Sequence, residues 1–251
     1  MTTAIDLALA GLAAAAAGAI NAVAGGGTLV SFPALVALGV PAVSANVTNT
    51  VALCPGYFGA ARAQRGALAS HRDLLRRTLP VAGVGGLVGS VLLVVTSESV
   101  FRNLVPFLIL LACALLGFQD RIKRFVVATG RAPGASPSIT LLAGVFGASV
   151  YGGYFGAGLG IMLLAVMGLA LDDPLNELNA MKSLLALAIN VMAALFFVFS
   201  GKVAWEFAAV MAPASLLGGH VGGLVAWRMN AKVLRAVVIT FGVAVAVRML
   251  L

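Results

Sequence analysis

The chain has 251 residues, of which 61% are hydrophobic and 10% charged, and its mean hydropathy is +1.08. Soluble domains carry about 25% charged residues, so no water-soluble fold of this size could bury so much apolar surface. The formal net charge is +8. Its basic residues gather between apolar stretches, where they indicate the cytoplasmic side of a membrane rather than nucleic-acid binding.

Ten apolar segments follow one another along the chain. Stretches of about 20 apolar residues are typical of membrane-spanning helices, so the sequence predicts an all-α integral membrane protein with eight to ten membrane segments. The first segment has no basic start and is too long for a signal peptide, so we expect it to be retained. The segments are 4–24, 28–39, 44–64, 79–95, 100–118, 138–157, 160–171, 178–199, 207–227 and 233–250.

Two polar stretches between these segments, 65–78 and 119–137, are expected to lie in the cytoplasm because of their basic residues. The second is rich in glycine and proline, which is typical of a flexible joint. It divides the chain into a first transmembrane repeat (1–118), a cytoplasmic linker (119–137) and a second transmembrane repeat (138–251). The basic residues are Arg62, Arg65, Arg72, Arg76, Arg77, Arg121, Lys123, Arg124 and Arg131.

The same pattern occurs in both halves at a constant offset of 133 positions, as from Gly27 to Gly160. Paired, interrupted apolar segments in corresponding halves indicate the binding site of a transporter. The pattern comprises Gly25, Gly26, Gly27, Pro41, Asn46, Asn49, Pro80, Gly85, Gly86, Gly89 and Arg102 in the first half. It recurs as Gly158, Leu159, Gly160, Pro174, Asn179, Lys182, Pro213, Gly218, Gly219, Gly222 and Arg235. We expect the pairs Gly85/Gly89 and Gly218/Gly222 to allow close helix packing.

Residues 4–39 cannot form one straight transmembrane helix. Such a helix would be about 54 Å long, whereas the hydrocarbon core is about 30 Å thick. The chain must therefore break at Gly25 to Gly27, which leaves 28–39 as a half-helix, a short crossing or one arm of a hairpin. Single crossings give parallel halves and hairpins give antiparallel halves. Placing Arg228 and Lys232 on the cytoplasmic side favours the inverted arrangement.

Each break predicts an anion-binding end. Helix N-termini carry partial positive charge and N–H donors, and the half-helices would begin at Thr28 and Ile161. Two such ends can converge near the middle of the membrane. The alternative interpretation is that the glycines only permit tight packing.

Polar residues follow each break on one helical face: Asn46 and Asn49 in the first half, Asn179 and Lys182 in the second. A lysine followed by a long apolar run normally faces a cavity or a partner, so we predict that Lys182 binds substrate. Two alternatives are that Lys182 extends to the interface or pairs statically with Glu177 or an aspartate.

Further polar residues in apolar segments could contribute to the same cavity, or could form helix–helix hydrogen bonds: Asn21, Tyr57, Ser149, Tyr151, Tyr154 and Asn190. His220 could relay protons or be a packed neutral histidine. Glu98 is expected to be solvated. No cluster of histidine, cysteine and carboxylate residues has ligand spacing along the chain, so we predict no metal, no cofactor and no enzymatic activity.

The chain resembles the sulfite exporter TauE/SafE family, also called the toluene-sulfonate uptake permease family. The resemblance covers nearly the whole chain and rests on residues 24–35, the turn 39–41, residues 45–49 and the segment ending at Asn179–Lys182. It implies a bacterial inner-membrane, multi-pass carrier for sulfur-containing anions such as sulfite, sulfonates and sulfoacetate. The family pattern has lysine at the position of Asn49, so one of two cations, Lys182, would remain.

These observations together predict a secondary transporter for sulfite or an organosulfonate, working by alternating access around a midplane anion site. No nucleotide-binding motif is found, so we expect coupling to H⁺ or another ion, or facilitated exit. The partners are the small anion and the lipid bilayer, with a homodimer left open. Alternatives are an anion channel, a transporter of another small carboxylate or oxyanion, and a membrane subunit or enzyme that needs a partner.

Overall fold

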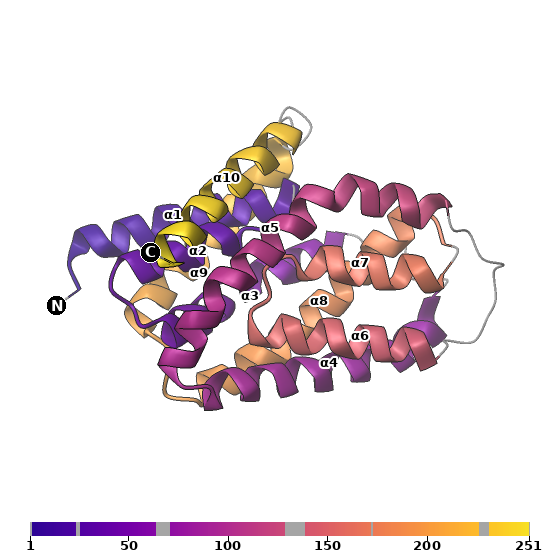
Figure 1. The fold of residues 1–251 in the computed structure, drawn as a ribbon, viewed down its shortest axis with the longest axis horizontal. Helices are drawn as coiled ribbons and strands as arrows, with labels where there is room; N and C mark the ends of the chain where they lie inside the picture. Colours follow the sequence, from indigo (N-terminus) through magenta and orange to yellow (C-terminus); the bar gives the residue numbers. More distant parts are fainter. Residues whose placement is uncertain are drawn as a thin grey trace.

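The computed structural model describes residues 2–23, 26–63, 71–128, 139–171, 173–225 and 231–250, and these form helices joined by short loops (Figure 1). No strand occurs in these ranges. Gly25, Arg65, Arg131 and Arg228 lie outside them. The helices are α1 (Ala4–Val23), α2 (Thr28–Ala37), α3 (Ala42–Ala63), α4 (Arg72–Val95), α5 (Glu98–Ala128), α6 (Ile139–Tyr154), α7 (Leu159–Ala170), α8 (Leu175–Val198), α9 (Trp205–Val225) and α10 (Ala231–Leu250).

The ten predicted segments correspond to these ten helices, with two notable differences in length. Helix α4 begins at Arg72 rather than at 79, and α5 continues to Ala128, well into the predicted linker 119–137. Both extensions are polar helix, which apolar patterning does not detect. In the α5 extension, Arg235 of α10 donates a 2.8 Å hydrogen bond to Asp120, which ties this polar part of α5 to α10.

The lengths and compositions of the helices are those of a multi-pass membrane protein. Five helical segments in the described ranges are long and apolar enough to cross a membrane: Ala4–Asn21, Arg72–Val95, Glu98–Ile122, Glu177–Val198 and Lys232–Leu250. Helices α2, α6 and α7 are apolar but shorter. Helix α2 has ten residues, or about 15 Å, which is half of a hydrocarbon core of about 30 Å. It therefore has the length of a half-helix.

Helices of the two halves pack closely against each other at glycines. Helix α1 lies against α9, and α4 lies against α6. A Cβ added at Gly89 would lie 2.0 Å from the carbonyl oxygen of Val150, and one at Gly218 would lie 2.0 Å from that of Ala15. The predicted packing role of these glycines is confirmed, because only glycine permits so close a backbone approach.

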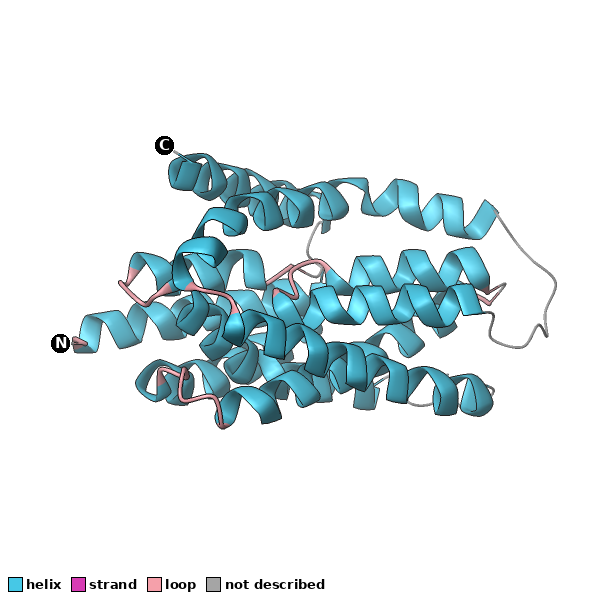
Figure 2. Cartoon of the chain, turned by 60° about the horizontal axis from the view of Figure 1, so that its bottom comes forward, coloured by secondary structure: helices cyan, strands magenta, loops and turns pink. Residues whose placement is uncertain are grey.

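Corresponding helices of the two halves run in opposite directions. Helices α1, α3 and α9 are parallel to one another, and α4, α6 and α8 run the other way (Figure 1). Both chain ends lie toward the same end of the bundle (Figures 1 and 2). These directions are the ones that an inverted arrangement requires. The duplication itself remains a prediction from the sequence.

An aromatic cluster at the centre of the larger core joins the halves. The ring of Phe32 on α2 lies 5.5 Å from the ring of Phe155, which follows α6, and 6.5 Å from that of Phe101 on α5. All three side chains are buried, and the rings meet edge to face, a favoured geometry. Helix α2 is thereby held against the turn between α6 and α7.

Candidate functional site

Each half contains a helix break with a glycine in the left-handed region. Gly26 precedes α2 with φ of 93°, and Gly158 precedes α7 with φ of 77°. Residues with a side chain rarely adopt this conformation, whereas glycine does so readily. The predicted breaks at these positions are therefore present in both halves, although Gly25 itself lies outside the described residues.

The two breaks converge on one turn of α5. A Cβ added at Gly26 would lie 3.3 Å from the side chain of Leu116. One added at Gly158 would lie 3.4 Å from the side chain of Leu115 and 3.6 Å from the Cα atom of Ala112. Because these three α5 residues span little more than one helical turn, the starts of α2 and α7 lie at the same level of the bundle.

Several backbone N–H groups at these helix starts already have partners. The Gly27 N–H donates to Asn21 Oδ1 at 2.7 Å. The N–H groups of Leu29 and Ile161 donate to the carbonyl oxygens of Gly26 and Gly158 at 2.9 Å. Part of the predicted donor set is thus used inside the protein, and the Asn21 oxygen already accepts a hydrogen bond at the start of α2.

In the first half, α2 covers the polar face of α3. The Ser31 hydroxyl on α2 donates to Asn49 Oδ1 at 2.5 Å and to the Gly27 carbonyl at 3.3 Å. Ser31, Asn49 and Thr28 are all buried. Sequence analysis overlooked Ser31, although a serine one turn after a glycine break is a detectable signal.

Asn46 links the first half to the break in the second. Its Nδ2 atom donates to the carbonyl oxygen of Tyr154, the last residue of α6, at 2.8 Å. The side chain is only 1% exposed, and its Oδ1 atom has no hydrogen-bond partner among the described residues. Since a buried amide oxygen without a partner costs about 1–3 kcal/mol, this atom is an acceptor suited to a ligand or a water.

In the second half, Lys182 lies against the first turn of α7. Its ammonium donates to Asn179 Oδ1 at 3.0 Å. A Cβ added at Gly160 would lie 3.3 Å from Lys182 Cδ, so the lysine stem crosses the space that this glycine leaves open. Both Asn179 and Lys182 are only partly buried. This half therefore presents a cation beside a helix break.

The other predicted cavity residues are dispersed. Tyr154 Oη is 3.4 Å from Thr96 Oγ1, Asn190 donates to the Ala186 carbonyl of its own helix at 2.8 Å, and Tyr57 packs on the smaller core cluster. Tyr151 and Ser149 also donate to backbone carbonyls, those of Ala157 and Val145. These contacts favour the structural interpretation of these residues.

The alternative of a packed, neutral His220 is wrong, because this side chain is exposed on α9. Gly218 and Gly222 face α1, and a residue midway between them falls on the opposite side of the helix. Glu98 is exposed, as expected, and its carboxylate also accepts hydrogen bonds from the N–H groups of Ala42 and Val43 at the start of α3.

The described residues form ten helices, with breaks before α2 and α7 that both contact one turn of α5, and such discontinuous helices are typical of multi-pass membrane transporters. The model of the sulfite exporter TauE/SafE family matches residues 10–249. The chain therefore belongs to this family. No solved structure matches it significantly.

Curated relatives share nearly the whole length of the chain. The probable membrane transporter protein ORF9 of Sinorhizobium sp. is 28% identical over 243 residues, covering 95% of this chain and 90% of the relative. The probable membrane transporter protein YfcA of Escherichia coli K12 is 26% identical over 244 residues, covering 93% and 86%. A probable membrane transporter protein of Haemophilus influenzae is 28% identical over 238 residues, covering 92% and 89%.

Proposed function

We propose that the protein is a secondary transporter that moves small sulfur-containing anions, sulfite or an organosulfonate such as sulfoacetate, across the bacterial inner membrane. The proposal rests above all on the approach of Gly26 and Gly158 to the same turn of α5. It is also supported by the family and by relatives named as probable membrane transporters.

Lys182 is the residue proposed to bind the anionic head. Its ammonium is held by Asn179 beside the N-terminal turn of α7, where the helix dipole also favours negative charge. A hydrogen bond to a charged group contributes about 1.5–3 kcal/mol. A single lysine suits a sulfonate or a singly charged sulfur oxyanion.

Asn46 adds a hydrogen-bond acceptor, whereas Lys182 is a donor. Because Nδ2 is bound to the Tyr154 carbonyl, the side chain presents Oδ1, which can only accept a hydrogen bond. The complementary group is the hydroxyl of hydrogen sulfite or, for sulfoacetate, which has no hydroxyl, a water that accompanies the solute. The proposed site therefore combines one cation, from the second half, with one acceptor, from the first.

Alternating access would require the halves to move around this site. The antiparallel directions of corresponding helices suit such a movement, since the same motion in each half opens opposite sides. Coupling to H⁺ or to another ion gradient is part of the proposal, and His220 is not assigned a part in it.

The test is uptake of radiolabelled sulfite and sulfoacetate into liposomes that contain the purified protein. Flux should saturate with anion concentration, and Lys182→Ala should weaken the apparent affinity about 10-fold or more, as expected from losing about 1.5 kcal/mol or more. Lys232→Ala removes an exposed lysine at the start of α10 and is the matched control.

Three outcomes would contradict the proposal. Flux that rises linearly with concentration would indicate a channel. Equal competition by chloride or acetate would indicate a different solute. An unchanged affinity in Lys182→Ala would remove the proposed anion contact.

A further inference from the structure

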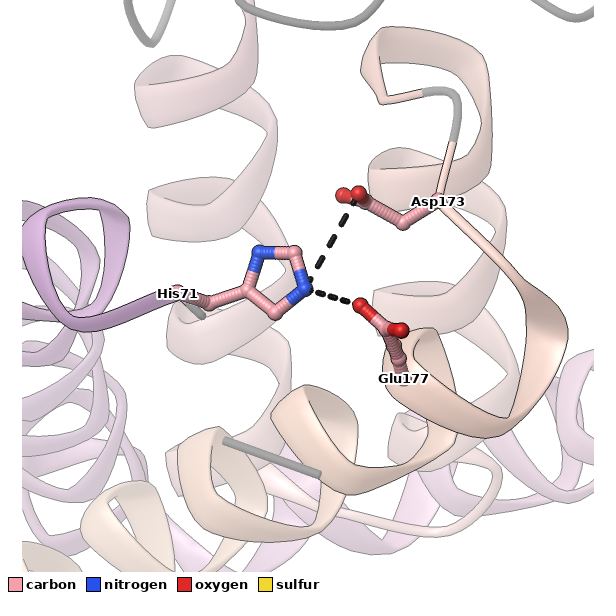
Figure 3. A group of neighbouring side chains, drawn as sticks. All are labelled: His71, Asp173 and Glu177. Carbon is pink, nitrogen blue, oxygen red and sulfur yellow. Dashed lines mark hydrogen bonds and ion pairs between the residues drawn. The ribbon is translucent and has the colours of Figure 1, made fainter. Parts of the chain in front are cut away.

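Three side chains that could ligate a metal ion meet at one end of the bundle. His71 lies immediately before α4, Asp173 lies in the connection between α7 and α8, and Glu177 lies in the first turn of α8 (Figure 3). The sequence predicted no metal site, because His71 is about 100 positions from both carboxylates. Only the fold brings them together.

The three groups point at a common centre. Nε2 of His71 hydrogen-bonds to Oε2 of Glu177 and lies 3.8 Å from Oδ1 of Asp173. The three ligand atoms lie within 4.8 Å of one another. The side chains are 11%, 27% and 28% exposed for His71, Asp173 and Glu177, so the cluster is largely but not fully shielded from solvent.

This arrangement matches the coordination chemistry of first-row divalent cations. Zinc binds imidazole nitrogen and carboxylate oxygen at about 2.0–2.2 Å, which places neighbouring ligand atoms about 3–3.5 Å apart. The His71–Asp173 separation of 3.8 Å is slightly longer than that range, so small side-chain rotations would complete the site. A neutral imidazole with two carboxylates also supplies two negative charges, which a divalent ion balances.

We propose that His71, Asp173 and Glu177 form a binding site for a first-row divalent cation, with Zn²⁺ as the best match. Three protein ligands leave one tetrahedral position for water. This site is distinct from the proposed anion site, and it does not depend on which solute is transported.

The ion would link the two halves of the chain. His71 belongs to the first half, whereas Asp173 and Glu177 belong to the second, so a bound ion would fasten α4 to α8 at this end of the molecule. This is also the end that the basic connection 65–78 predicts to be cytoplasmic. Movement of α8 relative to α4 would then be coupled to metal occupancy.

The first experiment measures binding directly. The full chain is purified in detergent, stripped of metal with a chelator and titrated with Zn²⁺. Bound metal is determined by elemental analysis after gel filtration, and the thermal midpoint is recorded at each concentration. We expect one equivalent per chain and a midpoint that rises with Zn²⁺, since a ligand that binds the folded state stabilises it.

Variants then assign the ligands. His71→Ala should weaken Zn²⁺ affinity about 10-fold or more, given that even outer-shell partners of metal ligands contribute 10–100-fold. Glu177→Gln should do the same and is less disruptive to folding. His220→Ala is the matched control, because the chain has two histidines and His220 is exposed on α9. Asp73→Asn is the control for Asp173→Asn, since Asp73 is 93% exposed on the nearby α4.

Substituting Co²⁺ gives an independent readout, because its visible absorption reports the ligand set. The spectrum should change in Asp173→Asn and stay the same in Asp73→Asn. Zn²⁺ binding and thermal midpoints that are equal in the wild type, His71→Ala and Glu177→Gln would overturn the proposal. So would a wild-type midpoint that depends on pH but not on Zn²⁺, because the cluster would then be a hydrogen-bonded histidine–carboxylate contact without an ion.

Discussion

The segment formed by α2 and α3 and the segment formed by α7 and α8 have the same plan but different polar contacts. In the first, Asn49 is 1% exposed and accepts a hydrogen bond from Ser31. In the second, the equivalent residue is Lys182, which is only partly buried and lies over Gly160. The position equivalent to Ser31 is Leu164, which is buried and apolar.

The comparison shows how a repeated element can acquire two roles. In the first segment, the neutral Asn49 amide accepts a hydrogen bond from the Ser31 hydroxyl, so its oxygen has a partner within the same segment. In the second segment the apolar Leu164 offers no hydrogen-bonding group, and the partly buried Lys182 is bonded to Asn179 of its own helix instead. The lysine is therefore less enclosed than Asn49, and the first segment adds the Asn46 oxygen, which has no partner among the described residues.

The largest effect is expected from Gly27→Ala. The new Cβ would lie 2.2 Å from the carbonyl oxygen of Ala17, and backbone cannot yield as a side chain can. Overpacking of this kind destabilises by about 1–3 kcal/mol, so the thermal midpoint in detergent should fall by several degrees. An unchanged midpoint would mean that α1 and α2 are not in tight contact.

Asn49→Lys should make the two segments more alike. Because Asn49 is 1% exposed and a buried lysine needs a compensating group, the variant should be less stable without solute. Sulfoacetate, which has two negative charges, should be favoured over methanesulfonate, which has one, by about 10-fold in relative affinity. Competition in the liposome assay measures this ratio. Asn49→Asp has nearly the same size as the wild type and should weaken binding of both anions; an equal change for both anions in Asn49→Lys would argue against the site.

Glu98→Ala should destabilise the start of α3 by about 1 kcal/mol, because the carboxylate accepts from two N–H groups there and its charge also suits a helix N-terminus. Thermal unfolding measures the loss. Glu98→Gln retains an acceptor but not the charge and should lose less. If both variants match the wild type, the cap contributes nothing to stability.

The smallest change in stability is expected from Gly160→Ala, which is the counterpart of Gly27→Ala. Its Cβ would meet only the flexible Lys182 stem, at 3.3 Å, so the free energy of unfolding should change by less than about 1 kcal/mol. Anion affinity should fall, since the lysine must move aside. A loss of stability as large as that of Gly27→Ala would show that the surroundings of Gly160 are packed as tightly as those of Gly27.

Most of the fold could be predicted, because long apolar runs and glycine breaks are local signals. The polar ends of α4 and α5 could not, since helices such as α5 continue beyond the apolar region through contacts like that between Asp120 and Arg235.

The residues of the candidate site could be proposed from the sequence, but their contacts could not. The glycines and Lys182 stand out by position, but nothing in the sequence connects Leu115 or Leu116 with the breaks they contact. His71 illustrates the same limit, because its partners lie in the other half of the chain. The exposure of His220 also follows only from the packing partner of α9, because Gly218 and Gly222 face α1 and His220 lies midway between them in sequence.

The pairing of α1 with α9 has a consequence for synthesis at the ribosome. Helix α1 ends at Val23 and α9 begins at Trp205, so about 180 residues must be added before α1 meets its partner. At about 5–20 residues per second, the alanine- and glycine-rich surface of α1 waits roughly 10–40 s in the bilayer. Co-translational insertion must therefore protect an unpaired helix, and a chain truncated before α9 would be a target for quality-control proteolysis.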